Sequence, residues 1–172
     1  GRKNRNGAYQ GQIERAIQYL ENAQRVDPRR QDVKFELARS YRRSGRIQEA
    51  DKELDAVLVK HKNYPPALNL KAAMRLDEKN WEDALLYANK ALVYEGEGGS
   101  AGLIAGVANF YLQHWELSLN QLHASQSLIP NGHSANRIIA YLEANLGGAD
   151  AGSLLKDLLN AGGYDGNFVS LL

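Results

Sequence analysis

A period of 34 residues runs through four consecutive units of this sequence and constrains its fold more than any other feature. One column of the period holds a small side chain in every unit, and another holds a bulky apolar one. The small column is Ala16, Ala50, Ala84 and Ser118, and the bulky column is Ile13, Ile47, Trp81 and Trp115. A fixed spacing of this length is typical of repeat proteins. A small residue at the same point of each unit is expected where two helices approach closely, so the period predicts stacked helical repeats.

Apolar residues at helical spacing divide the chain into paired amphipathic segments. Pro28 ends the first segment, because proline disfavours the helical conformation of the residue before it. Gly45 closes a later turn, and Pro65 with Pro66 opens the next helix, where proline is tolerated. Helices are expected over 11–26, 33–41, 47–58, 65–76, 81–93, 101–112, 115–128, 135–146 and 149–159. No stretch alternates with period two for long enough to predict a strand, so the expected fold class is all-α.

Composition adds limits on chemistry and on location. The absence of cysteine excludes disulfides and thiolate metal sites. No apolar run approaches the ~20 residues that a membrane-spanning helix needs. Residues 1–62 hold 15 Lys and Arg against 9 Asp and Glu, whereas the whole chain has a net charge of +1. The first part of the chain is therefore strongly basic and the rest acidic.

The pattern resembles the tetratricopeptide repeat (TPR) over about residues 11–160. Small residues recur at two motif positions, and proline at a third, although Lys79 and Gln113 stand where the turn glycine is expected. The matching residues are Ala38, Ala72, Gly106 and Ala140 at the first position, the small column above at the second, and Pro28 and Pro130 at the third. The resemblance implies a right-handed solenoid of about four to five helical hairpins that acts as a non-catalytic scaffold for protein–protein interaction.

The resemblance also sets the expected repeat boundaries within a single array over 1–172. The second helix of a truncated repeat is expected over 11–30, and full repeats over 31–64, 65–98 and 99–132. A degenerate repeat follows over 133–160, and residues 161–172 form a cap or begin a further helix. Because the sequence begins at Gly1 without Met or a signal peptide, we expect it to be part of a longer protein.

The loosely kept consensus of this array is similar to that of the repeat lipoproteins of bacterial PEP-CTERM and exopolysaccharide export systems. This likeness implies a periplasmic location, with a lipid anchor in the full-length protein; the cytoplasm is the alternative. Two other functions remain open: direct binding of an anionic polysaccharide, and a role as the repeat half of a larger enzyme such as a glycosyltransferase.

No catalytic or cofactor motif is present, so we expect neither enzymatic activity nor a cofactor. The four histidines, His61, His114, His123 and His133, lack the spacing of a metal site. The glycines at 96–99 lack the lysine and the preceding strand of a phosphate-binding loop.

The resemblance implies a partner-binding groove lined by the first helix of each repeat. The residues carried over to it are Phe35, Arg39, Arg42, Arg43, Asn69, Leu103, Val107, Phe110, Tyr111, Arg137 and Tyr141. An extended acidic-then-apolar protein segment would suit such a groove. Ordinary solvated surface is the alternative for the arginines, and nucleic acid is not expected because the arginines lack interleaved aromatic residues.

Three side-chain placements are expected from the repeat and from the resemblance. Phe110 and Tyr111 are adjacent, so one is expected in the core and the other in the groove. Trp81 and Trp115 are expected to pack between helices. In the third repeat we expect Leu70 and Met74 to be buried, while Lys71 and Arg75 both reach solvent.

Overall fold

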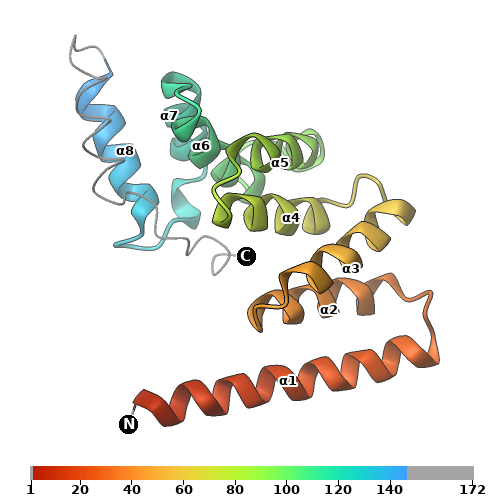
Figure 1. Ribbon diagram of the computed structural model, residues 1–172. Coiled ribbons are helices and arrows are strands. Elements are labelled where there is room, and N and C mark those ends of the chain that lie inside the picture. Colours follow the sequence, from red (N-terminus) through yellow and green to blue (C-terminus); the bar gives the residue numbers. More distant parts are fainter. Residues whose placement is uncertain (1, 147–172) are drawn as a thin grey trace. The chain divides into compact units, whose positions relative to one another are not determined.

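In a computed structural model, residues 2–146 are described, with the side chains of residues 7–146 (Figure 1). The described part consists of helices and turns and has no strand. The helices are α1 (Arg2–Val26), α2 (Gln31–Arg43), α3 (Ile47–Lys60), α4 (Pro65–Asp77), α5 (Trp81–Glu95), α6 (Ser100–Tyr111), α7 (Trp115–Ala124) and α8 (Ser134–Asn145), with a 3-10 turn, η1 (Gln126–Leu128), after α7. The all-α fold built from helical hairpins is thereby confirmed.

The chain divides into two compact units, Gly1–Ala67 and Leu68–Leu172. Unit 1 contains α1, α2, α3 and the first residues of α4, and unit 2 contains the rest of α4 and the helices that follow. The predicted repeat boundaries stay a prediction. The second helix of the degenerate repeat and the expected cap at 161–172 lie outside the described residues.

The turns inside three successive hairpins share one backbone geometry. In each, the amide N–H after the turn residue donates to the carbonyl five residues earlier: Arg46 to Tyr41 at 2.8 Å, Asn80 to Arg75 at 2.9 Å and His114 to Asn109 at 2.8 Å. The turn residue itself has positive φ: 83° at Gly45, 61° at Lys79 and 67° at Gln113. The turn that glycine favours is therefore kept in the two repeats that lack glycine, where left-handed backbone costs about 1–2 kcal/mol.

The small column shows where one helix closely approaches another. Ala50, Ala84 and Ser118 are fully buried, and Ser118 Oγ donates to the Gly106 carbonyl of α6 at 2.7 Å. Ala16 is exposed, although it belongs to the same column. It lies on α1, which begins at Arg2 rather than near residue 11 and has no preceding helix among the described residues to cover that face.

A polar cluster ties the three helices of unit 1 together. The Tyr41 hydroxyl of α2 donates to Glu21 Oε1 of α1 at 2.8 Å. Arg46, at the start of α3, lies with its guanidinium 4.5 Å from the centroid of the Tyr41 ring and pairs with Glu49 at 2.5 Å. Burial and the Glu21 carboxylate raise the pKa of the Tyr41 hydroxyl. The folded state therefore favours the protonated hydroxyl.

Removing that hydroxyl should have a pH-dependent effect on stability. Tyr41→Phe is expected to lower the free energy of unfolding by about 1–2 kcal/mol at pH 7, because Glu21 loses its donor. The raised pKa makes the hydroxyl stabilising below its ordinary pKa of about 10, and this contribution disappears as the pH rises further. Urea unfolding at pH 7 and pH 11 should thus show a smaller difference between Tyr41→Phe and wild type at pH 11. Tyr9→Phe, an exposed control, should match wild type, and an equal Tyr41→Phe effect at both pH values would contradict the assignment.

In unit 2, α6 is buried along nearly its whole length. Ten consecutive residues, from Ala101 to Phe110, are buried. α4 is similar, and Leu70 and Met74 are buried as expected. The expectation that Lys71 reaches solvent is wrong: only 6% of it is exposed, and its ammonium lies 5.3 Å from the centroid of the Tyr87 ring. Spacing along one helix does not indicate how many sides of it other segments cover.

Candidate functional site

In unit 1, one outward face of α2 carries four of the predicted groove residues, which recur at helical spacing. Phe35 and Arg39 are half-buried, and the Arg39 guanidinium lies 6.0 Å from the centroid of the Phe35 ring. Arg39 also pairs with Glu36 at 3.2 Å, which offsets part of its charge. Arg42 is half-buried, and Arg43, in the last turn, is exposed. This surface, here called the α2 face, is defined by Phe35, Arg39, Arg42 and Arg43.

An aromatic pair extends the α2 face toward the start of α4. Tyr64, which immediately precedes Pro65, packs edge-on against Phe35 with ring centroids 5.8 Å apart. Its backbone N–H donates to the His61 carbonyl at 3.1 Å, which closes the turn that positions it. Tyr64 remains 40% exposed. It was not among the predicted groove residues because it lies in a connection between helices. Its position as an aromatic residue just before two prolines was the signal that could have indicated it.

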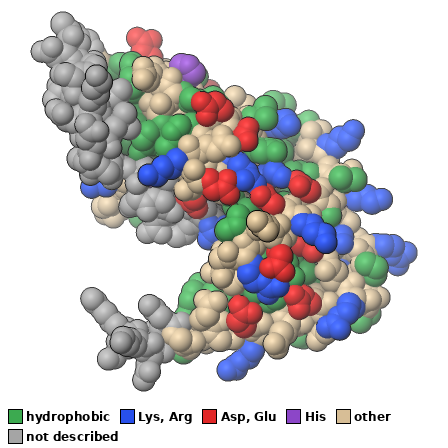
Figure 2. Space-filling view, in the orientation of Figure 1, with side chains coloured by type: hydrophobic (Ala, Val, Ile, Leu, Met, Phe, Trp, Pro, Cys, Tyr) green, Lys and Arg blue, Asp and Glu red, His purple; other side chains and the backbone are tan. Residues whose placement is uncertain are grey.

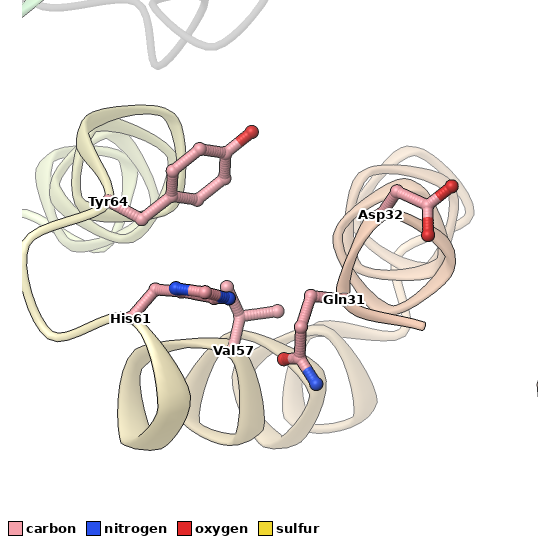
Figure 3. Close-up of a pocket in the computed structure, with 5 residues that line it drawn as sticks. All are labelled: Gln31, Asp32, Val57, His61 and Tyr64. Carbon is pink, nitrogen blue, oxygen red and sulfur yellow. The ribbon is translucent and has the colours of Figure 1, made fainter. Parts of the chain in front are cut away.

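A pocket of about 280 Å³ lies beside this aromatic pair, between α2 and the end of α3 (Figure 3). In the close-up, Tyr64 and His61 form one side, while Val57 of α3 lies below Tyr64, between His61 and Gln31. The other side comes from the first turn of α2, with Gln31 and Asp32. The Tyr64 and His61 rings and the Val57 side chain give the pocket an apolar wall against which an apolar side chain of a ligand could pack.

The polar groups of the pocket differ in how well they are satisfied. Asp32 pairs with Arg30, with an N–O distance of 2.6 Å, and this hydrogen bond lowers the pKa of the Asp32 carboxyl. Gln31 donates from Nε2 to the Arg29 carbonyl at 3.0 Å. Its Oε1 is buried and has no hydrogen-bond partner, and a buried acceptor without a donor is unusual. The pocket thus combines an apolar wall with one unsatisfied amide oxygen.

The predicted groove residues of unit 2 are mostly buried. Asn69, Leu103, Val107 and Phe110 belong to the interior, and Asn69 Nδ2 donates to Glu95 at 2.6 Å. These four side chains therefore do not form an open surface, because α4 and α6 are covered on several sides. That they contact a partner stays a prediction.

Aromatic residues of unit 2 form a packed cluster around Phe110. Tyr111 stacks on Trp81 with ring centroids 4.0 Å apart. Phe110 packs in T-shaped arrangements against Trp115 and Tyr141, with centroid distances of 5.6 Å and 6.2 Å. Both tryptophans thus pack between helices, as expected, and Phe110 is the core member of the adjacent pair. Tyr111 and Tyr141 are half-buried.

Arg137, the last of the predicted groove residues, lies on α8. It is exposed, and its role in the groove stays a prediction.

Residues 2–146 contain no group of three His, Asp or Glu side chains that could hold a metal ion. None of the described helices is both long and apolar enough to cross a bilayer. His123 Nε2 of α7 instead lies 2.7 Å from Glu143 Oε1 on the surface of α8. His114 Nδ1 lies 2.9 Å from Asn109 Oδ1.

Comparisons with known proteins agree with this architecture. Residues 8–74 match a family model described as tetratricopeptide repeat. The fold is similar to the crystal structure of a tetratricopeptide repeat protein from Parabacteroides merdae, with a TM-score of 0.65 and 18% identity over 98% of this chain and 71% of that chain. At this identity the likeness concerns the fold alone. No curated protein matches the chain.

Proposed function

From this likeness to tetratricopeptide repeat proteins, whose fold generally mediates protein–protein interaction, we propose that unit 1 binds an extended segment of a partner protein. The observation that carries the proposal is the continuous surface from the pocket through Tyr64 and Phe35 to the arginines of the α2 face. An apolar side chain of the partner enters the pocket beside Tyr64, and acidic side chains contact Arg39 and Arg43.

The chemistry of the surface supports a partner segment with an apolar residue at the pocket and acidic residues at the arginines. Guanidinium groups bind carboxylates with two parallel hydrogen bonds, which gives orientation as well as attraction. Phe35 and Tyr64 offer rigid aromatic area, the kind of side chain that most often anchors an interface.

The proposal predicts that substitutions at the two ends of this surface change different rate constants, association at the arginines and dissociation at Tyr64. Peptides selected from a random displayed library on the wild-type protein should be acidic with an apolar residue. Arg39→Ala combined with Arg43→Ala should slow their association about 5- to 10-fold and weaken its salt dependence, because exposed charges act mainly on the on-rate. Tyr64→Ala should speed dissociation about 10-fold or more, as loss of an apolar anchor does. Surface plasmon resonance at two salt concentrations measures both rates.

Matched controls separate the site from general effects of charge and aromatic area. Arg15→Ala removes an exposed arginine of α1, and Tyr94→Ala removes an exposed tyrosine of α5 that is 54% accessible. Both should bind selected peptides like wild type. Selection that yields no binder, or binders that are insensitive to Tyr64→Ala, would argue against the α2 face as the binding site.

The place of the protein in a cell-envelope or exopolysaccharide export system, and its periplasmic location, stay predictions from sequence likeness. Export of an acidic polysaccharide would be compatible with the arginines, but the aromatic pair at Phe35 and Tyr64 favours a protein segment.

A further inference from the structure

Unit 1 has a second hollow, which shares only Gln31 and His61 with the pocket described above. It has a volume of about 630 Å³ and is lined by the turn between α1 and α2, the start of α2 and the last turns of α3. Neither the α2 face nor Tyr64 contributes to it. This hollow is therefore a separate feature of the surface, and is called the turn hollow below.

The floor of the turn hollow is apolar and open to solvent. Pro28 lies in the turn, and Ala56 and Val59 lie one turn of α3 apart. Val59 is 74% exposed although it is β-branched and aliphatic. Most of its apolar side-chain surface contacts solvent rather than other residues, so covering that surface with a ligand would be favourable.

The rim of the turn hollow is cationic. Arg29, Lys34 and Lys60 line it, and no acidic residue does. Within residues 7–146, Lys34 and Lys60 form no ion pair, whereas Arg29 pairs with Asp27 at 3.1 Å. Basic side chains gather over this end of unit 1, at the α1–α2 turn and the end of α3 (Figure 2). The helix dipole favours a cation in the last turn of α3, but it gives no reason for Lys34 and Arg29 to converge on the same hollow.

We propose that the turn hollow is a second protein-docking site, which takes an acidic segment that carries an apolar side chain. The apolar side chain covers Val59 and Ala56, and the carboxylates on either side of it reach Lys34 and Lys60. An anionic polysaccharide could pair with the same lysines, but it has no apolar side chain to place on the floor. The proposal stands independently of the α2 face, because the two surfaces share none of the residues that are assigned to bind.

The test uses a fluorescein-labelled peptide in which one leucine is flanked on each side by two glutamates. Fluorescence anisotropy measures its affinity, and ¹H–¹⁵N NMR spectra locate it on the protein. Binding should shift the amide signals of Val59 and Lys60. Shifts confined to Phe35 and Arg39 would instead place the peptide on the α2 face and overturn the turn-hollow assignment.

Two matched pairs of variants test the rim and the floor separately. Lys60→Glu should weaken binding about 10-fold or more, whereas Lys52→Glu, the same charge change at an exposed position of α3, should weaken it less than about 2-fold. Val59→Ser should weaken binding about 3- to 10-fold, and Val93→Ser, at a valine of α5 that is 77% exposed, should have no effect. Equal losses within either pair would show only general charge or surface effects and would overturn the proposal.

Two further probes distinguish the class of ligand. A peptide with serine in place of the leucine should bind at least about 5-fold more weakly if the floor is used. An oligogalacturonate, an acidic carbohydrate, should not compete at equal charge concentration. Competition by the carbohydrate together with indifference to the leucine would identify an anionic-polysaccharide site and overturn the proposal of a protein segment.

Discussion

Ala50→Trp should abolish the native fold or lower the free energy of unfolding by more than about 3 kcal/mol, because overpacking a filled core typically costs 1–3 kcal/mol and more where two backbones approach. Ala50 lies on α3 and is fully buried, so a tryptophan side chain would have to displace the residues packed around it. Ala16→Trp is the matched control, since Ala16 occupies the same column of the repeat but is exposed. It should unfold within about 0.5 kcal/mol of wild type, as surface substitutions usually do. Urea titration followed by circular dichroism compares the two.

Comparing these two variants tests both the close helix contact at Ala50 and the exposure of the α1 face at Ala16. If Ala50→Trp left stability unchanged, the close helix contact inferred from the small column would be wrong. If Ala16→Trp were as damaging as Ala50→Trp, the exposed face of α1 would have to be covered in solution.

Two glycine substitutions should change stability in opposite directions. A Cβ at Gly106 of α6 would lie 2.8 Å from Cγ and Cδ2 of Leu122, whose side chain is fully buried on α7. Gly106→Ala should therefore lower the free energy of unfolding by about 1–3 kcal/mol, despite the better helix propensity of alanine. At Gly11 of α1 the added methyl group meets no atom within 4 Å.

Gly11→Ala should accordingly raise the free energy of unfolding by about 0.5–1 kcal/mol, which is the cost of a glycine inside a helix. Both variants are measured by urea unfolding under the same conditions. A stabilising Gly106→Ala would show that α6 and α7 do not approach as closely as the 2.8 Å contact requires.

The repeat made most of the fold predictable from the sequence. A 34-residue period fixes where each helix must come close to another, and Ala50, Ala84 and Ser118 are buried as that reasoning requires. The same reasoning fails at Ala16, because a period states which residues are equivalent and not whether a neighbouring helix is present. It also fails at Lys71, because the pattern along one helix does not show how many segments surround that helix.

The candidate site was predictable only where it lies on a helix. The resemblance to the tetratricopeptide repeat assigned Phe35 and Arg39 to one helix face, and the structure brings their side chains together. Tyr64 and His61 complete the pocket from a turn, where the direction of a side chain depends on backbone angles rather than on a periodic pattern. The buried Oε1 of Gln31 was equally invisible, since whether an amide finds a partner is decided by contacts between segments.

The burial of α6 has a consequence for the thermal unfolding of this protein. Its ten buried residues from Ala101 to Phe110 include no charged side chain. While α6 stays packed against α5 and α7, that stretch is protected from solvent. Once these helices separate, the stretch becomes an uncharged, mainly apolar segment that can associate with the same segment of another molecule. We expect aggregation to compete with refolding on heating, so that a temperature scan reports the rate of an irreversible step rather than an equilibrium.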